Sequence, residues 1–88
     1  MQDVYGVAAF RSRQQVLRFE QMLRMEGVPV RIVSTPRDIS MGCGLSVRFP
    51  AEDSERVLRL AKAGDTGNLI GVYRAEYDGA RLRVMPIR

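Results

Sequence analysis

Apolar residues along this chain follow two spacings, one typical of strands and one typical of helices. Residues 4–10 form a short apolar run rich in β-forming residues, which predicts a buried strand. A helix is expected to begin at Ser12, whose hydroxyl can cap the first turn while Gln15, three residues later, completes a capping box. Gly27 supplies the left-handed residue that commonly ends a helix. The buried stripe of this helix is expected to consist of Val16, Phe19 and Leu23.

The middle of the chain continues with two strands, a loop and a second helix. Residues 28–34 predict the second strand, and residues 45–49 predict the third. Between them, residues 35–44 contain a proline and two glycines, which predict a loop. Pro50 is expected to open a helix with acidic residues in its first turn, and Gly64 is expected to end it. The buried stripe of this second helix is expected to be Val57, Leu58 and Ala61.

The last third of the chain predicts two paired strands. Residues 68–76 and 81–84 read as the fourth and fifth strands, and the Asp78-Gly79 pair between them is typical of a tight hairpin. The element order is then that of the split-βαβ, ferredoxin-like arrangement with one added strand. This α+β fold has an antiparallel sheet with both helices on one face. We expect a single domain over residues 1–88.

Composition excludes several classes of protein. The chain has no apolar run of about 18 residues, so we expect no membrane span. Its first residues, Met1-Gln2-Asp3, carry an acid where a signal peptide carries basic residues, which favours the cytoplasm. The formal charge is +4, and Lys62 is the only lysine. Arginine suits carboxylate, phosphate or sulfate partners, although most of these side chains are expected to serve general solvation.

The chain has no histidine and only one cysteine, Cys43. A single cysteine excludes an internal disulfide and any CxxC motif. The absence of histidine excludes Ser-His-Asp and Cys-His catalysis and removes the commonest zinc ligand. We therefore expect no metal and no cofactor, and the residues leave open whether the chain is an enzyme.

The predicted topology places Cys43 at one edge of the sheet. The strand 2–3 loop, the end of the first strand and the start of the first helix would share this edge. Helix-start amides and arginine side chains there would favour the thiolate, which is the nucleophilic form. Gly42 and Gly44 would allow a partner to approach the sulfur closely. Besides Cys43, the candidate site residues are Thr35, Arg37, Gly42, Gly44, Arg11, Ser12 and Arg13.

A structural explanation of the same residues stays open. A lone cysteine is more often a small buried apolar residue than a reactive group. The flanking glycines can be required by turn geometry alone. Thr35 and Ser40 are better explained as turn residues than as nucleophiles, because neither has a candidate base.

Two short motifs resemble a small bacterial family of selenium/sulfur carrier-like proteins. They are Thr35-Pro36-Arg37 and Cys43-Gly44-Leu45, in a chain whose first strand ends at Phe10 and whose first helix follows Ser12. The resemblance covers residues 4–76 and leaves the fifth strand as an addition. It implies that Cys43 carries sulfur or selenium, and that the partners are donor and acceptor proteins.

These residues support two functional hypotheses. In the first, Cys43 carries sulfur or selenium as a persulfide or selenide adduct. In the second, the chain is a regulatory module that binds a small ligand or a protein through an anion pocket at the same loop. Nucleic acid is not expected as a partner, since the base-stacking aromatic motif of RNA-recognition domains is absent. The added fifth strand could form a homodimer contact.

Overall fold

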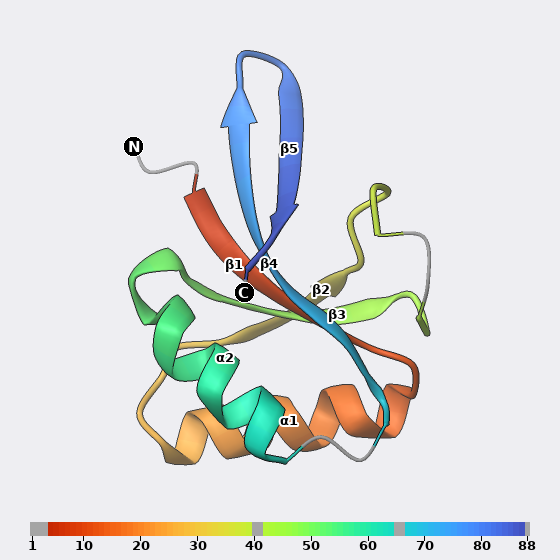
Figure 1. The fold of residues 1–88 in the computed structure, drawn as a ribbon, viewed down its shortest axis with the longest axis vertical. Coiled ribbons are helices and arrows are strands. Elements are labelled where there is room, and N and C mark those ends of the chain that lie inside the picture. Colours follow the sequence, from red (N-terminus) through yellow and green to blue (C-terminus); the bar gives the residue numbers. More distant parts are fainter. Residues whose placement is uncertain (1–3, 40–41, 65–66, 88) are drawn as a thin grey trace.

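In a computed structural model of the chain, the described residues are 4–39, 42–64 and 67–87, and they form two helices and one antiparallel sheet of five strands (Figure 1). The α+β class is therefore confirmed. Neither helix in this part of the chain is long and apolar enough to cross a membrane. Predictions that fall on residues 1–3, 40–41 and 65–66 lie outside the described residues. The elements are β1 (Val4–Phe10), α1 (Arg13–Met25), β2 (Arg31–Ser34), β3 (Leu45–Pro50), the 3-10 turn η1 (Ala51–Asp53), α2 (Ser54–Ala63), β4 (Leu69–Asp78) and β5 (Arg81–Pro86).

The strands lie in the order β2-β3-β1-β4-β5, and every neighbouring pair is antiparallel. β1 is therefore central. In its register Val7 stands opposite Arg48 of β3 and Tyr73 of β4. Because successive side chains of a strand point to opposite faces, Tyr5, Val7 and Ala9 share one face of the sheet. Gly6, Ala8 and Phe10 share the other.

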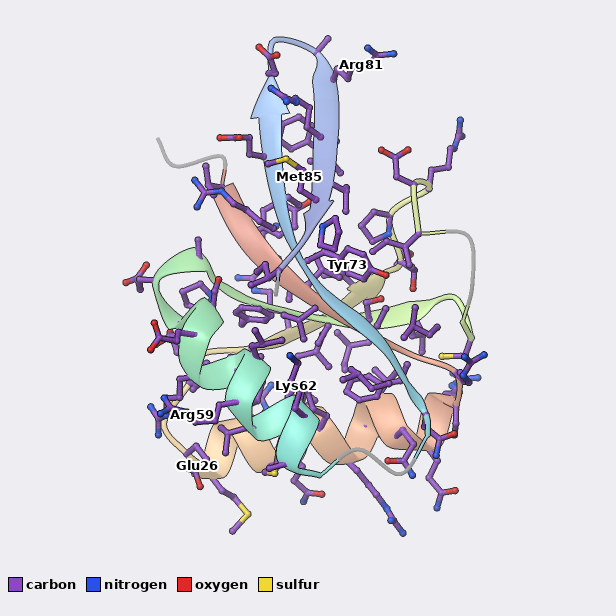
Figure 2. All side chains as sticks on the ribbon, in the orientation of Figure 1. Glu26, Arg59, Lys62, Tyr73, Arg81 and Met85 are labelled. Atoms are coloured by element: carbon purple, nitrogen blue, oxygen red, sulfur yellow. The ribbon has the colours of Figure 1, made fainter. Side chains whose placement is uncertain are left out.

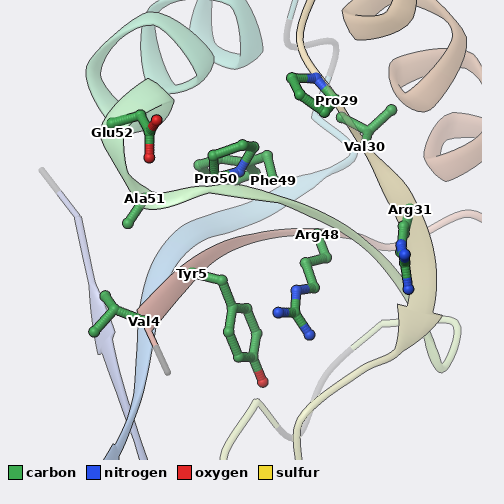
Figure 3. Close-up of a pocket in the computed structure, with 10 residues that line it drawn as sticks. All are labelled: Val4, Tyr5, Pro29, Val30, Arg31, Arg48, Phe49, Pro50, Ala51 and Glu52. Carbon is green, nitrogen blue, oxygen red and sulfur yellow. The ribbon is translucent and has the colours of Figure 1, made fainter. Parts of the chain in front are cut away.

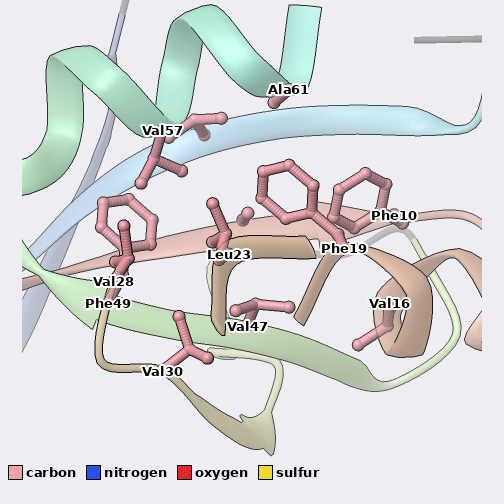
Figure 4. Packing of buried hydrophobic residues seen from close by; sticks show 12 residues of the cluster. Phe10, Val16, Phe19, Leu23, Val28, Val30, Val47, Phe49, Val57 and Ala61 are labelled. Atoms are coloured by element: carbon pink, nitrogen blue, oxygen red, sulfur yellow. The ribbon is translucent and has the colours of Figure 1, made fainter. Parts of the chain in front are cut away.

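Both helices cover the same face of the sheet (Figure 4). The predicted stripe of α1 is confirmed, since Val16, Phe19 and Leu23 are all buried. They pack in one cluster with residues of α2 and of the central strands, and the Phe10 and Phe19 rings lie 5.1 Å apart between centroids. Gly6 makes room in this layer, because a Cβ there would lie 2.0 Å from the Phe49 ring. The main core is thus a helix-to-sheet layer.

The opposite face of the sheet carries a smaller apolar cluster without a helix. Its buried residues are Val7, Ala9, Ile39 and Ala75, and tyrosines such as Tyr73 pack against it. Ile39 belongs to the connection between β2 and β3, so this connection folds over part of the sheet. We call this side the helix-free face.

The β4–β5 hairpin agrees with the sequence prediction and extends beyond it. Asp78 pairs with Arg81, and Gly79 in the turn between them has a φ of 68°. β4 continues to Asp78 instead of ending at residue 76. The hairpin extends past the rest of the sheet, with Arg81 near its tip (Figure 2).

Three local predictions need correction. β2 begins at Arg31 and not at residue 28, because Pro29 has no N–H for strand pairing and the Val28 amide instead bonds to the Leu23 carbonyl at 2.9 Å. Pro50 ends β3, and a 3-10 turn separates it from α2, which starts at Ser54. Ser12 is the N-cap residue of α1, but its side chain makes no capping hydrogen bond.

Candidate functional site

Cys43 lies in the connection between β2 and β3, two residues before β3 begins. The glycines on both sides have positive φ angles, 112° at Gly42 and 88° at Gly44. Residues with a Cβ rarely adopt this conformation, so the backbone itself requires glycine at both positions. The same glycines leave the two sides of Cys43 without side chains. The turn-geometry explanation and the close-approach explanation are therefore compatible.

The Cys43 side chain is half-buried. It packs against the helix-side cluster, and its thiol donates a weak hydrogen bond to the Leu45 carbonyl oxygen at 3.6 Å. This bond exists only for the thiol, because a carbonyl oxygen cannot bond to a thiolate. The sulfur is thus held in one direction at rest, and a reaction at the sulfur has to break this contact.

The segment before Cys43 touches the end of β1. A Cβ added at Gly42 would lie 2.9 Å from the Phe10 carbonyl oxygen and 2.8 Å from the Ile70 Cδ1 atom. The β2–β3 connection therefore meets the chain close to where it turns from β1 into α1, as Figure 1 also shows. Arg11, Ser12 and Arg13 follow Phe10 directly. Arg11 and Arg13 are exposed, and Ser12 is half-buried.

Thr35 closes the base of this connection. Its amide donates to the Gly44 carbonyl at 2.9 Å, and its hydroxyl is hydrogen-bonded to the Ser46 hydroxyl at 2.7 Å. Ser46 is fully buried, and it is a residue that the sequence alone did not single out. Ser46 lies in a strand rich in apolar residues, and nothing in that sequence pattern indicates that Ser46 pairs with Thr35. The Thr35 hydroxyl is therefore a structural group in this arrangement.

Arg37 lines a cavity that β5 also lines. It is exposed and lines a cavity of about 580 Å³ together with β5 residues such as Arg81 and Arg83, and Cys43 does not line this cavity. Among the residues that the structure describes, no arginine donates a hydrogen bond to the Cys43 sulfur. The structure thus brings Gly42 to the end of β1.

Two arginines that sequence analysis left unassigned, Arg31 and Arg48, occupy the helix-free face. Their alternation with apolar residues in the sequence indicates exposed strand positions. The strand register, which the sequence does not reveal, sets them directly opposite each other.

Comparison with protein families gives one match, over residues 5–69, to a family described as "Putative Se/S carrier protein-like". The chain belongs to this family. The match includes every candidate residue of the loop and of the α1 start, and it ends before most of β4 and all of β5. The family resemblance drawn from the two sequence motifs is therefore confirmed. No curated protein matches the chain. No solved structure matches it either.

Proposed function

We propose that the protein is a sulfur or selenium carrier whose working group is the Cys43 thiol. The observation that carries this proposal is family membership combined with a single cysteine inside the matched region. Exposed glycines on both sides of that cysteine support it, because its two neighbours in the chain place no side chain between a partner protein and the sulfur. Its partners would be a donor protein and an acceptor protein.

The proposed loading step is an exchange between two sulfur atoms. The thiol first loses its proton to solvent and gives up its hydrogen bond to Leu45. The Cys43 thiolate then attacks the terminal sulfur of a persulfide on the donor protein. The new S–S bond forms as the donor's S–S bond breaks, and the donor cysteine leaves as a thiolate that takes a proton from solvent. No net oxidation or reduction occurs, and a terminal selenium atom would be transferred in the same way.

Delivery reverses this exchange. A nucleophile of the acceptor attacks the terminal sulfur or selenium, and the Cys43 thiolate leaves. Arg11, Arg13 and the first amides of α1 would stabilise negative charge on the sulfur, since helix-start amides and guanidinium groups both favour anions. The contact between Gly42 and Phe10 supports this assignment because it brings the loop to the segment that holds these groups.

The alternative function, a regulatory module with an anion pocket at the same loop, has less support. The Thr35 hydroxyl is already bonded to Ser46, and Arg37 faces a different cavity. A Cys43→Ser variant separates the two functions. Ligand binding through the loop would survive this change, whereas a carrier would lose its activity completely.

We also propose that residues 1–88 fold as one ferredoxin-like domain. The strand order β2-β3-β1-β4-β5, with both helices packed into one cluster on one face, supports this assignment. β5 would be the addition to the minimal arrangement of four strands.

Alkylation kinetics test the chemical basis of the carrier. Cys43 should react with iodoacetamide at neutral pH faster than a thiol placed at an exposed turn position, in the double variant Cys43→Ser/Ala80→Cys. Ala80 is a suitable control site because it is exposed and lies in the β4–β5 turn. Equal or slower alkylation of Cys43 would remove the support for an activated thiol.

A further inference from the structure

Two like charges face each other on the helix-free side of the sheet. Arg31 of β2 stands directly opposite Arg48 of β3, and both side chains are exposed. Like charges at directly opposite positions of paired strands are destabilising. Neither arginine has an acidic partner among the described residues, whose ion pairs are Arg24–Glu20, Arg56–Glu26 and Arg83–Asp78.

Tyr5 holds one of these guanidinium groups in place. The central carbon of the Arg48 guanidinium lies 3.9 Å from the centroid of the Tyr5 ring, a cation–π contact. Burial raises the pKa of Tyr5 above 10.0, and Tyr77 raises it further, while Arg48 partly offsets both effects. The Tyr5 hydroxyl is therefore protonated at neutral pH and can donate a hydrogen bond beside the Arg48 guanidinium.

These groups line a pocket of about 370 Å³ (Figure 3). Tyr5, Arg48 and Arg31 project to the same side of their strands in this view, whereas the acidic residue of the lining, Glu52, lies away from both guanidinium groups. The apolar lining residues are Val4, Pro29, Val30, Phe49, Pro50 and Ala51, and of these Val30 and Phe49 belong to the helix-side core. On the helix-free face, the pocket thus presents two guanidinium groups beside an aromatic ring.

We propose that this pocket binds the phosphate group of a small organic molecule, with Arg31 and Arg48 as its anchors. A guanidinium group presents a planar fork of donors that matches phosphate oxygens, and two such groups match the charge of a phosphate monoester, which is about −2 at pH 7. A single carboxylate would balance only one of the two charges. The Tyr5 ring, which lies on the same side as both guanidinium groups, would contact the organic part of the ligand.

The phosphate pocket is separate from the Cys43 site. Arg48 lies near the end of β3 on the helix-free face, whereas Cys43 precedes the start of β3 and packs on the helix side. The two proposals can therefore fail independently. Cys43→Ser should leave phosphate binding unchanged, and substitutions of Arg31 or Arg48 should leave the loading of Cys43 unchanged.

Isothermal titration at constant ionic strength, with chloride as the replaced ion, tests the proposal. Inorganic phosphate and a nucleoside monophosphate should bind at one saturable site, and Arg31→Gln or Arg48→Gln should each weaken binding about tenfold, because each removes a charge-assisted bond. The matched control is Arg59→Gln, which changes the net charge by the same amount. Arg59 is an exposed residue of α2 (Figure 2). It should leave affinity within about twofold, because distant exposed charges are screened by salt. An equal loss in the control, or no saturable binding, would overturn the proposal.

The source of the phosphate group is decided by a second titration, with a short single-stranded oligonucleotide. Weaker binding per molecule than the nucleoside monophosphate would support a small-molecule ligand. Tighter binding that does not depend on Arg31 would overturn the assignment of the pocket.

Thermal unfolding gives a readout that a purely structural role would not produce. In chloride, Arg31→Gln should unfold at a higher temperature than Arg59→Gln, because it removes the repulsion between opposite strands. In phosphate at equal ionic strength, the wild-type protein should gain more stability than Arg31→Gln, whose weaker binding gives a smaller gain. Equal gains in the two proteins would refute a role for Arg31 in binding.

Discussion

Replacing Gly42 by alanine should destabilise the protein far more than the same change at Gly44, although both glycines are exposed and flank the same cysteine. Both have positive φ angles, so each alanine would incur the cost of a left-handed backbone, about 1–2 kcal/mol. Alanine also lowers the conformational entropy of the unfolded chain. This effect favours folding by about 0.4–1 kcal/mol and offsets part of the backbone cost. The two effects leave a net loss of about 1 kcal/mol at Gly44, where a Cβ would meet nothing within 4 Å.

Gly42 adds a steric conflict to this common cost. Its Cβ would lie 2.8 Å from the Ile70 Cδ1 atom, which can move, and 2.9 Å from the Phe10 carbonyl oxygen, which is backbone. Overpacking of this kind typically costs about 1–3 kcal/mol. The total expected for Gly42→Ala is therefore about 3 kcal/mol.

Urea unfolding followed by circular dichroism measures both variants. The midpoint for Gly42→Ala should fall well below that for Gly44→Ala, with similar slopes. Equal midpoints would refute the contact between the cysteine loop and the end of β1, on which the proposed charge environment of Cys43 depends.

Three further predictions concern the core, the loop base and the helix-free face. Leu23→Ala should cost about 3 kcal/mol in urea unfolding, because a fully buried side chain leaves a cavity, and a loss under 1 kcal/mol would contradict the packing. Thr35→Ala should cost about 1–2 kcal/mol by the same measurement, since it leaves the buried Ser46 hydroxyl without its partner; unchanged stability would argue against that bond. Burial raises the pKa of Tyr5 in the folded state above 10.0. The protonated phenol therefore contributes to the free energy of unfolding below pH 10, and this contribution is lost as pH rises through the folded-state pKa. Ultraviolet titration should show one phenol that ionises at a higher pH than the others, and at a still higher pH in Arg48→Gln. Loss of this last ionisation step in Tyr5→Phe would assign it to Tyr5. A step that persists in Tyr5→Phe would refute the assignment.

Helical spacing was the most informative pattern in the sequence. Val16, Phe19 and Leu23 identified the buried side of α1 because one face of a helix has to meet the sheet, whatever the rest of the fold does. The starts of elements were less predictable. Pro50 is compatible with a helix start, a strand end or a turn, and only the packing of the following residues places α2 at Ser54.

The candidate site was predictable only in part. Turn geometry was one of two explanations of the glycines around Cys43, and their positive φ angles agree with it. The cavity that Arg37 shares with β5 was not predictable, because the sequence does not show that nearby Ile39 packs against the helix-free face. Arg31 and Arg48 stand opposite each other because of the register between β2 and β3. The alternation of polar and apolar residues does not determine this register.

The most direct test of the central claim is the transfer of sulfur to Cys43 from a persulfide donor. The protein is incubated with a cysteine desulfurase and free cysteine, and its intact mass is recorded before and after reduction. We predict that the wild-type protein gains the mass of one sulfur atom, that reduction removes it, and that Cys43→Ser and Cys43→Ser/Ala80→Cys gain none. A wild-type protein that stays unmodified, or a displaced thiol at residue 80 that is loaded equally well, would contradict the account.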